Sequence, residues 1–148
     1  MSGGGRYNAM VVNGQFQPRR VAYESITADA TLTPNDSGKT IFVGPTGVDI
    51  TIPATPEKGL NYKFIMAEDN VTTACTITAD GSGEFFAGSV STAADGAATA
   101  IFDGSTTDVI SFATTADQGD MVEVVSDGST WFVQGQCFAA ASITAATS

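Results

Sequence analysis

Turn-forming residues punctuate the 148-residue chain at short intervals. Glycine lies beside Asp, Asn, Ser or Pro in six such places: 35–38, 44–47, 80–83, 95–96, 103–104 and 127–128. Between these turns, apolar and polar residues alternate. Val48, Ile50 and Ile52, for example, alternate with Asp49 and Thr51. This period of two predicts short, half-buried β-strands.

The composition also favours strands. Val and Ile together number 21 and Thr numbers 20, whereas Leu occurs only twice. Branched Cβ atoms suit a pleated sheet, while Leu, Glu, Lys and Arg are the residues that helices prefer. A chain of this length buries enough surface for one hydrophobic core. We therefore expect one all-β domain, a two-sheet β-sandwich or jelly-roll-like fold of about nine to eleven strands.

Individual strands can be assigned from the alternation. The expected segments are 21–26, 39–43, 48–52, 62–66, 73–78, 84–90, 98–102, 108–112, 121–126 and 129–134. The last two flank Asp127-Gly128, a pair that tolerates the positive φ angles of a type I′ turn, so we expect a two-residue hairpin there. The Ala-rich stretches at 93–98 and 139–141 are too short for stable helices and are expected to be loops or edges.

Charge divides the chain into two parts. The sequence contains 6 basic and 16 acidic side chains, a net charge of −10. Residues 1–20 contain three arginines and no acid, whereas no Lys or Arg follows Lys63. We expect a basic, extended N-terminal arm over residues 1–20 and an acidic β-sandwich domain over residues 21–148.

The arm also carries apolar side chains that a free tail has little reason to carry. Two placements are open: the arm packs back on its own domain, or it docks on a neighbouring subunit or a larger scaffold. In the second placement, the contacting residues would be Arg6, Tyr7, Met10, Val11, Val12, Phe16, Arg19 and Arg20.

Histidine is absent from the sequence, which excludes a Ser-His-Asp triad, a Cys-His pair and an imidazole base. Two pairs of carboxylates, Asp80 with Glu84 and Asp117 with Asp120, could bind calcium or act as the acid and base of a glycosidase. Asp-Gly sequences form turns first of all, so we expect solvated turns instead. We expect no enzymatic activity, no metal site and no cofactor.

Partners and compartment follow from charge and hydropathy. A pI near 4.1 argues against nucleic acid, because phosphate binding requires a basic surface. No apolar stretch has the length of a membrane span, and none has the form of a secretory signal, so we expect no membrane partner and synthesis in the cytoplasm.

Several residues have an expected place in the packing. Cys75 and Cys137 are expected to be buried small hydrophobic residues, with a single disulfide as the alternative. Trp131 is expected to anchor the core. Phe85 and Phe86 are adjacent in a predicted strand and must face opposite sides, so one ring needs cover outside the core. An oligomer interface at Phe85 and Phe86 would supply that cover.

Five segments of the chain carry a family resemblance: 26–41, 50–53, 59–64, 77–81 and 119–133. In this order they are similar to β modules in virion proteins of tailed bacteriophages, especially marine ones. Such modules occur in capsid decoration proteins and in tail-fibre or receptor-binding proteins. The resemblance covers roughly residues 26–135 and does not include the arm.

The resemblance implies a capsid decoration (cement) protein. Such a protein would bind the major capsid protein on the exterior of the assembled shell, form a homotrimer with itself and stabilise the virion. It would be made in the host bacterial cytoplasm, and no catalytic residue is implied. The alternative is a receptor-binding or tail-fibre module whose loops, such as 89–98 or 105–108, recognise host glycan or protein. A glycan hydrolase using Asp80 and Glu84 is a further alternative.

Overall fold

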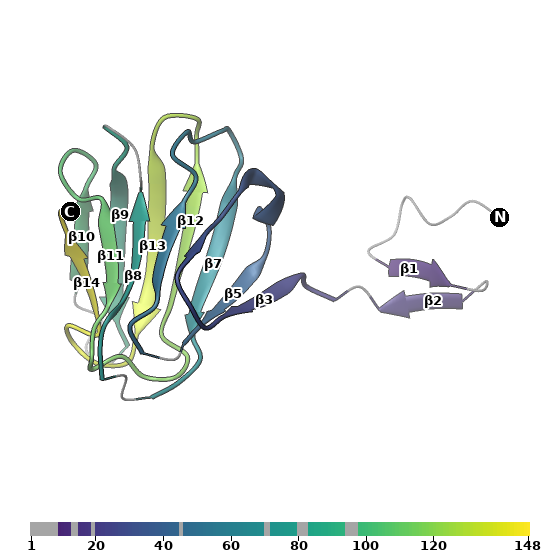
Figure 1. Cartoon of the computed structure of the whole chain (residues 1–148), viewed down its shortest axis with the longest axis horizontal. Coiled ribbons are helices and arrows are strands. Elements are labelled where there is room, and N and C mark those ends of the chain that lie inside the picture. The colour runs from purple at the N-terminus through teal and green to yellow at the C-terminus, as the bar shows by residue number, and fades with distance from the viewer. Residues whose placement is uncertain are drawn as a thin grey trace.

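The computed structural model describes residues 9–12, 15–18, 20–44, 46–69, 72–79, 83–93 and 98–148. Two sheets contain nearly all the strands and pack face to face as a β-sandwich (Figure 1). In spatial order, the seven-stranded sheet contains β10 (Ala98–Asp103), β9 (Phe86–Thr92), β13 (Trp131–Cys137), β12 (Met121–Ser126), β7 (Asn61–Met66), β5 (Thr40–Val43) and β3 (Tyr23–Ile26). The five-stranded sheet contains β14 (Ile143–Ala146), β11 (Val109–Phe112), β8 (Cys75–Ala79), β6 (Asp49–Ile52) and β4 (Ala30–Thr31). The all-β sandwich expected from the sequence is confirmed.

Parallel and antiparallel pairs are mixed in both sheets. From β3 to β8 the chain alternates between the two sheets. Each time it returns to a sheet, the new strand runs in the same direction as the previous strand of that sheet. This route makes β3–β5, β5–β7, β4–β6 and β6–β8 parallel neighbours. Parallel strands require a crossover, and here the intervening strand of the opposite sheet provides it.

The core lies between the two sheets and follows from the alternation along each strand. In β7, the side chains at positions 62, 64 and 66 are buried and those between them are not. Trp131 is fully buried, as expected, and its ring centroid lies 6.0 Å from that of Tyr62. Burial of each large apolar side chain contributes about 1.5–3 kcal/mol, so this layer supplies the main stabilising term. Cys75 and Cys137 are buried as well.

All ten expected segments contain strands, but the sandwich has more strands than expected. Its sheets of seven and five strands exceed the expected nine to eleven because of β4 and β14. The two residues of β4 are too few to show alternation, and β14 follows an Ala-rich stretch that was assigned to loops or edges. The only helical segment in the described part of the chain is the 3-10 turn η2 (Pro34–Asp36).

The hairpin between β12 and β13 is confirmed, but its turn is longer than expected. Ser126 pairs with Trp131, which leaves the four residues 127–130 in the loop. The Asp127 carboxylate accepts hydrogen bonds from the amides of Ser129 and Thr130, both at 2.9 Å. This side-chain bonding holds the wider loop in place of the two-residue type I′ turn.

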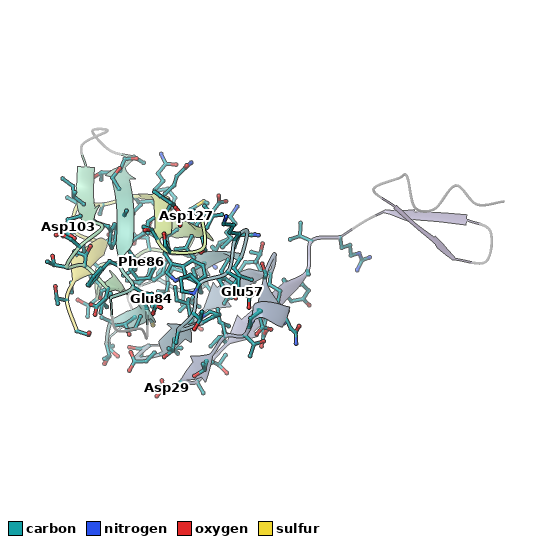
Figure 2. The ribbon with its side chains drawn as sticks, turned by 90° about the horizontal axis from the view of Figure 1, so that it is seen from above. Asp29, Glu57, Glu84, Phe86, Asp103 and Asp127 are labelled. Atoms are coloured by element: carbon teal, nitrogen blue, oxygen red, sulfur yellow. The ribbon has the colours of Figure 1, made fainter. Side chains whose placement is uncertain are left out.

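A separate two-stranded sheet lies in the N-terminal arm. It consists of β1 (Ala9–Val12) and β2 (Gln15–Pro18), which pair antiparallel. Both views show this hairpin set apart from the sandwich, beyond the start of β3 (Figures 1 and 2).

Candidate functional site

The arm hairpin contains four of the residues predicted to contact a partner. Met10, Val11 and Val12 lie in β1 and Phe16 lies in β2, with Val11 opposite Phe16 in the register. Arg20 is exposed in the segment that follows. Three further predicted contacts, Arg6, Tyr7 and Arg19, lie outside the described residues.

The junction between arm and sandwich exposes apolar surface. Val21 is 68% exposed and Tyr23 is 70% exposed, although the Tyr23 ring has an edge contact with Phe42 at a centroid distance of 6.2 Å. Tyr23 begins β3, which is an edge strand of the seven-stranded sheet. Edge strands present unpaired backbone groups and are common sites of association. The arm therefore leaves the sandwich at a sheet edge with exposed aromatic surface.

The expected oligomer interface at Phe85 and Phe86 needs a correction at Phe86. Its ring has no exposed surface and packs at 6.0 Å from Phe102 inside the sandwich. Phe86 pairs with Trp131 in the register, and this pairing turns both side chains into the core. Phe85 is half-buried, so an interface there stays a prediction.

The acidic pair at 117 and 120 is linked through the Asp120 carboxylate and the Asp117 backbone amide. Asp120 is fully buried and accepts hydrogen bonds from the amides of Asp117 at 3.0 Å and Phe138 at 2.8 Å. Burial raises the pKa of Asp120, and the two amide hydrogen bonds oppose that rise. The buried carboxylate thus connects the loop before β12 to the residue after β13.

The other pair is only partly described. Glu84 is half-buried, and Asp80 lies outside the described residues. Within the described ranges, no group of three or more His, Cys, Asp and Glu side chains is placed so that it could hold a metal ion. Figure 2 shows Asp29 and Asp103 at different sides of the sandwich.

The loop after β10 is organised by one carboxylate. Asp103 accepts hydrogen bonds from the amides of Ser105 and Thr106 at 2.8 Å and from the Thr106 hydroxyl at 2.6 Å. These bonds, with that of the Thr106 hydroxyl the largest contribution, lower the pKa of Asp103. Thr107 donates from its hydroxyl to the backbone oxygen of Phe86 at 3.2 Å, which fastens the loop to β9. Hydrogen bonds thus anchor residues 105–107 of the loop 105–108, named above for the tail-fibre alternative, to Asp103 and to β9.

A groove crosses the outer face of the seven-stranded sheet. It consists of two adjoining hollows. The first, of about 350 Å³, lies over β5, β7, β12 and β13. The second, of about 370 Å³, lies over β9, β12 and β13. Glu123 and Gln134 line both hollows, which therefore lie side by side. We call this the outer-face groove; its main residues are Asn61, Lys63, Glu123, Phe132, Gln134 and Gln136.

Ion pairs neutralise the two lysines of the outer-face groove. Lys63 Nζ lies 3.5 Å from Glu123 Oε1. Lys39 Nζ lies 2.6 Å from Asp36 Oδ1 and 2.9 Å from Glu24 Oε2. The hydrogen bond from Lys39 lowers the pKa of Asp36. The same hydrogen bond, together with the one to Glu24, raises the pKa of Lys39. The groove is therefore polar, and both of its lysines are ion-paired.

The sequence analysis did not identify the outer-face groove. Most of its residues are the outward-facing positions of five strand segments, and nothing in one segment indicates which other segment lies beside it. The register supplies that information, because Thr40, Lys63, Glu123, Gln134 and Ser89 are successive partners on neighbouring strands.

Comparison with protein-family models and with curated proteins finds no match to the chain. Among the described residues, no helix has the length and apolar character needed to cross a membrane.

Proposed function

We propose that this chain is a capsid decoration protein that binds the exterior of an assembled phage capsid through its N-terminal arm and acts as a homotrimer. The observation that carries the proposal is the position of the β1–β2 hairpin, which forms its own sheet outside the sandwich. A two-stranded hairpin alone is marginally stable in water. The arm therefore gains stability when it packs on a partner surface.

The charge distribution supports docking through the arm. Residues 1–20 carry three arginines and no acid, a net charge of +3. Residues 21–148 carry three lysines and all 16 acids, a net charge of −13. The arm is thus attracted to acidic surfaces on the shell or on a neighbouring copy, while the acidic sandwich remains well solvated.

The resemblance of residues 26–135 to phage virion modules agrees with this function. A β-sandwich with a projecting arm can strengthen a shell through contact area alone, because each arm links its sandwich to a neighbour. The major capsid protein and a second copy of this chain are the partners proposed here.

Removal of the arm tests the proposal. Purified full-length protein and a variant lacking residues 1–20 are mixed with expanded capsids devoid of this protein, and bound protein is measured after sedimentation. We expect saturable binding of the full chain and none of the truncated variant, while the thermal unfolding of the sandwich persists. Unchanged binding of the truncated variant would overturn the proposal.

A point variant of the arm refines the test. Phe16→Asp places a charge in β2, and Ile101→Asp is its matched control, because Ile101 is 68% exposed on the sandwich. We expect Phe16→Asp alone to weaken capsid binding.

Copy number separates decoration from the tail-fibre alternative. Hundreds of copies per virion, located on the shell by electron microscopy, fit the proposal, whereas about a dozen copies on the tail contradict it. Sedimentation equilibrium of the purified chain tests the trimer directly.

A further inference from the structure

The outer-face groove has the volume of a ligand site. Its two hollows measure about 350 and 370 Å³, each within the range of roughly 300–1,000 Å³ that small-molecule sites span. Because Glu123 and Gln134 line both hollows, the two hollows lie side by side over the strands from β5 to β9. An elongated ligand that occupies both hollows passes over Glu123 and Gln134.

Uncharged hydrogen-bonding groups dominate the polar lining. Asn61, Gln134 and Gln136 each supply an amide donor and an acceptor, and Ser89 and Ser91 supply hydroxyls. Gln134 pairs with Ser89 in the register and Gln136 pairs with Ser91, so amide and hydroxyl groups alternate across the strands. Such a lining matches a ligand whose own groups both donate and accept.

The same groove contains an apolar platform. Phe132 on β13 lies opposite Val125 on β12, and each is 46% exposed. An exposed aromatic ring beside amides offers a flat apolar surface together with hydrogen bonds. A ligand that fits both features has apolar C–H faces and a rim of hydroxyl groups, which is the chemistry of a sugar ring.

Charge and backbone geometry disfavour other ligands. Phosphates and nucleic acids favour sites where cations outnumber anions, but here Lys63 lies beside Glu123, and Lys39 lies beside both Asp36 and Glu24. Extended peptides bind by adding to a free sheet edge, whereas β7, β12 and β13 each have a hydrogen-bonded neighbour on both sides. The groove therefore offers ion-paired lysines, uncharged polar side chains and no open backbone.

We propose that the outer-face groove binds an uncharged oligosaccharide, with the Phe132 ring stacked on a sugar and the amides of Gln134 and Gln136 bonded to its hydroxyls. This binding is independent of the proposed decoration function, because the groove lies on the sandwich and not on the arm. A shell protein with such a site would hold the particle to neutral glycan at a cell surface.

Saturation-transfer NMR and calorimetry with the purified full chain test the proposal. The probes are the hexasaccharides of cellulose, amylose, laminarin, mannan and chitin, with oligogalacturonate as the acidic comparison. We expect at least one neutral probe to bind and oligogalacturonate not to bind. Binding of none of the neutral probes, or of the acidic probe alone, would overturn the assignment.

Matched variants locate the site. Phe132→Ala and Gln134→Ala should each lower the affinity for the neutral probe about tenfold, the change expected when one good contact is lost. Phe138→Ala removes a ring of similar exposure, 56%, that does not line the groove, and should leave binding unchanged. All three side chains are exposed, so folding, checked by circular dichroism, should persist.

The rival occupant is a second copy of this chain. If Phe132→Ala instead dissociates an oligomer, measured by light scattering, and no sugar binds, the groove is a contact between copies and the proposal fails. No capsid is needed for these experiments, so their outcome is separate from that of the arm deletion.

Discussion

The hydroxyl of Tyr62 donates a 2.9 Å hydrogen bond to the backbone oxygen of Thr33. Thr33 precedes η2, where its amide and its hydroxyl donate to the Asp36 carboxylate at 2.8 and 2.9 Å. Tyr62 itself is only 1% exposed and contacts Trp131. One phenol thus connects the turn before β5 to the centre of the core.

Tyr62→Phe tests the strength of this connection. The substitution keeps the ring but leaves the Thr33 oxygen without the phenol donor, so we expect the free energy of unfolding to fall by about 1–2 kcal/mol. Urea unfolding measures the change. Tyr23→Phe is the control, because Tyr23 is 70% exposed and should lose almost nothing. Equal losses in the two variants would contradict the expectation.

Tyr62 also predicts a loss of stability in alkali. Burial raises the pKa of Tyr62 from 10.0 to about 12, with smaller contributions from Asp36 and Glu57. As pH rises through this interval, the unfolded chain releases the proton while the folded chain retains it, so stability declines. Tyr62→Phe lacks this component, and its unfolding free energy should fall less steeply above pH 10 than that of the parent. Parallel declines would show that Tyr62 does not contribute.

The strands were predictable because alternation is a local property. Each of the ten expected segments needs only its own polar and apolar positions to show which face is buried. The order of the strands was not predictable, because it depends on the chain switching sheets at almost every step from β3 to β8. The two-residue turn at Asp127 was wrong because the carboxylate bonds of that residue favour a wider loop.

The candidate sites, too, were predictable only where they depend on one continuous segment and not on strand pairing. The sequence placed Phe85 and Phe86 on opposite faces, but only the pairing of Phe86 with Trp131 decides which ring enters the core. The outer-face groove likewise depends on which strands are neighbours. The arm differs, because its charge and its apolar residues belong to one continuous segment and were visible in the sequence.

Asp103 predicts an acid-sensitive loop. The hydrogen bonds from Thr106 and Ser105 lower the pKa of Asp103, so its stabilising contribution is present above the unfolded value of 3.8 and is lost as pH falls below it. Asp103→Ala should remove this contribution and speed hydrogen exchange at the amides of Ser105 and Thr106 at neutral pH, because both amides lose their acceptor. Glu68→Ala, at an exposed acid elsewhere, is the control. Unchanged exchange in Asp103→Ala would rule out the Asp103 side chain as the organiser of the loop.

We expect position 88 in β9 to accept no side chain larger than that of glycine. Its φ angle is +144°, and a Cβ there would lie 2.0 Å from the backbone oxygen of Val133 on the neighbouring strand. Gly88→Ala must separate β9 from β13, and we expect a loss of about 3 kcal/mol or more in thermal or urea unfolding.

Gly59→Ala is the comparison for Gly88→Ala, because φ there is +86° but no atom lies within 4 Å of the added Cβ. It should cost only the backbone strain of about 1–2 kcal/mol. A loss at Gly88 no larger than that at Gly59 would contradict the steric explanation.

We expect the buried Asp120 carboxylate to stabilise the fold and not to bind a metal ion. Both of its oxygens accept backbone amides, those of Asp117 and Phe138. Asp120→Ala leaves both amides without this acceptor, at a cost of roughly 1–3 kcal/mol each, whereas Asp120→Asn retains one carbonyl oxygen and should cost less. Because both oxygens are engaged, millimolar calcium should not change the melting temperature of the parent. A calcium-dependent rise in melting temperature that Asp120→Asn abolishes would show instead that the carboxylate exchanges its amide bonds for a metal ion.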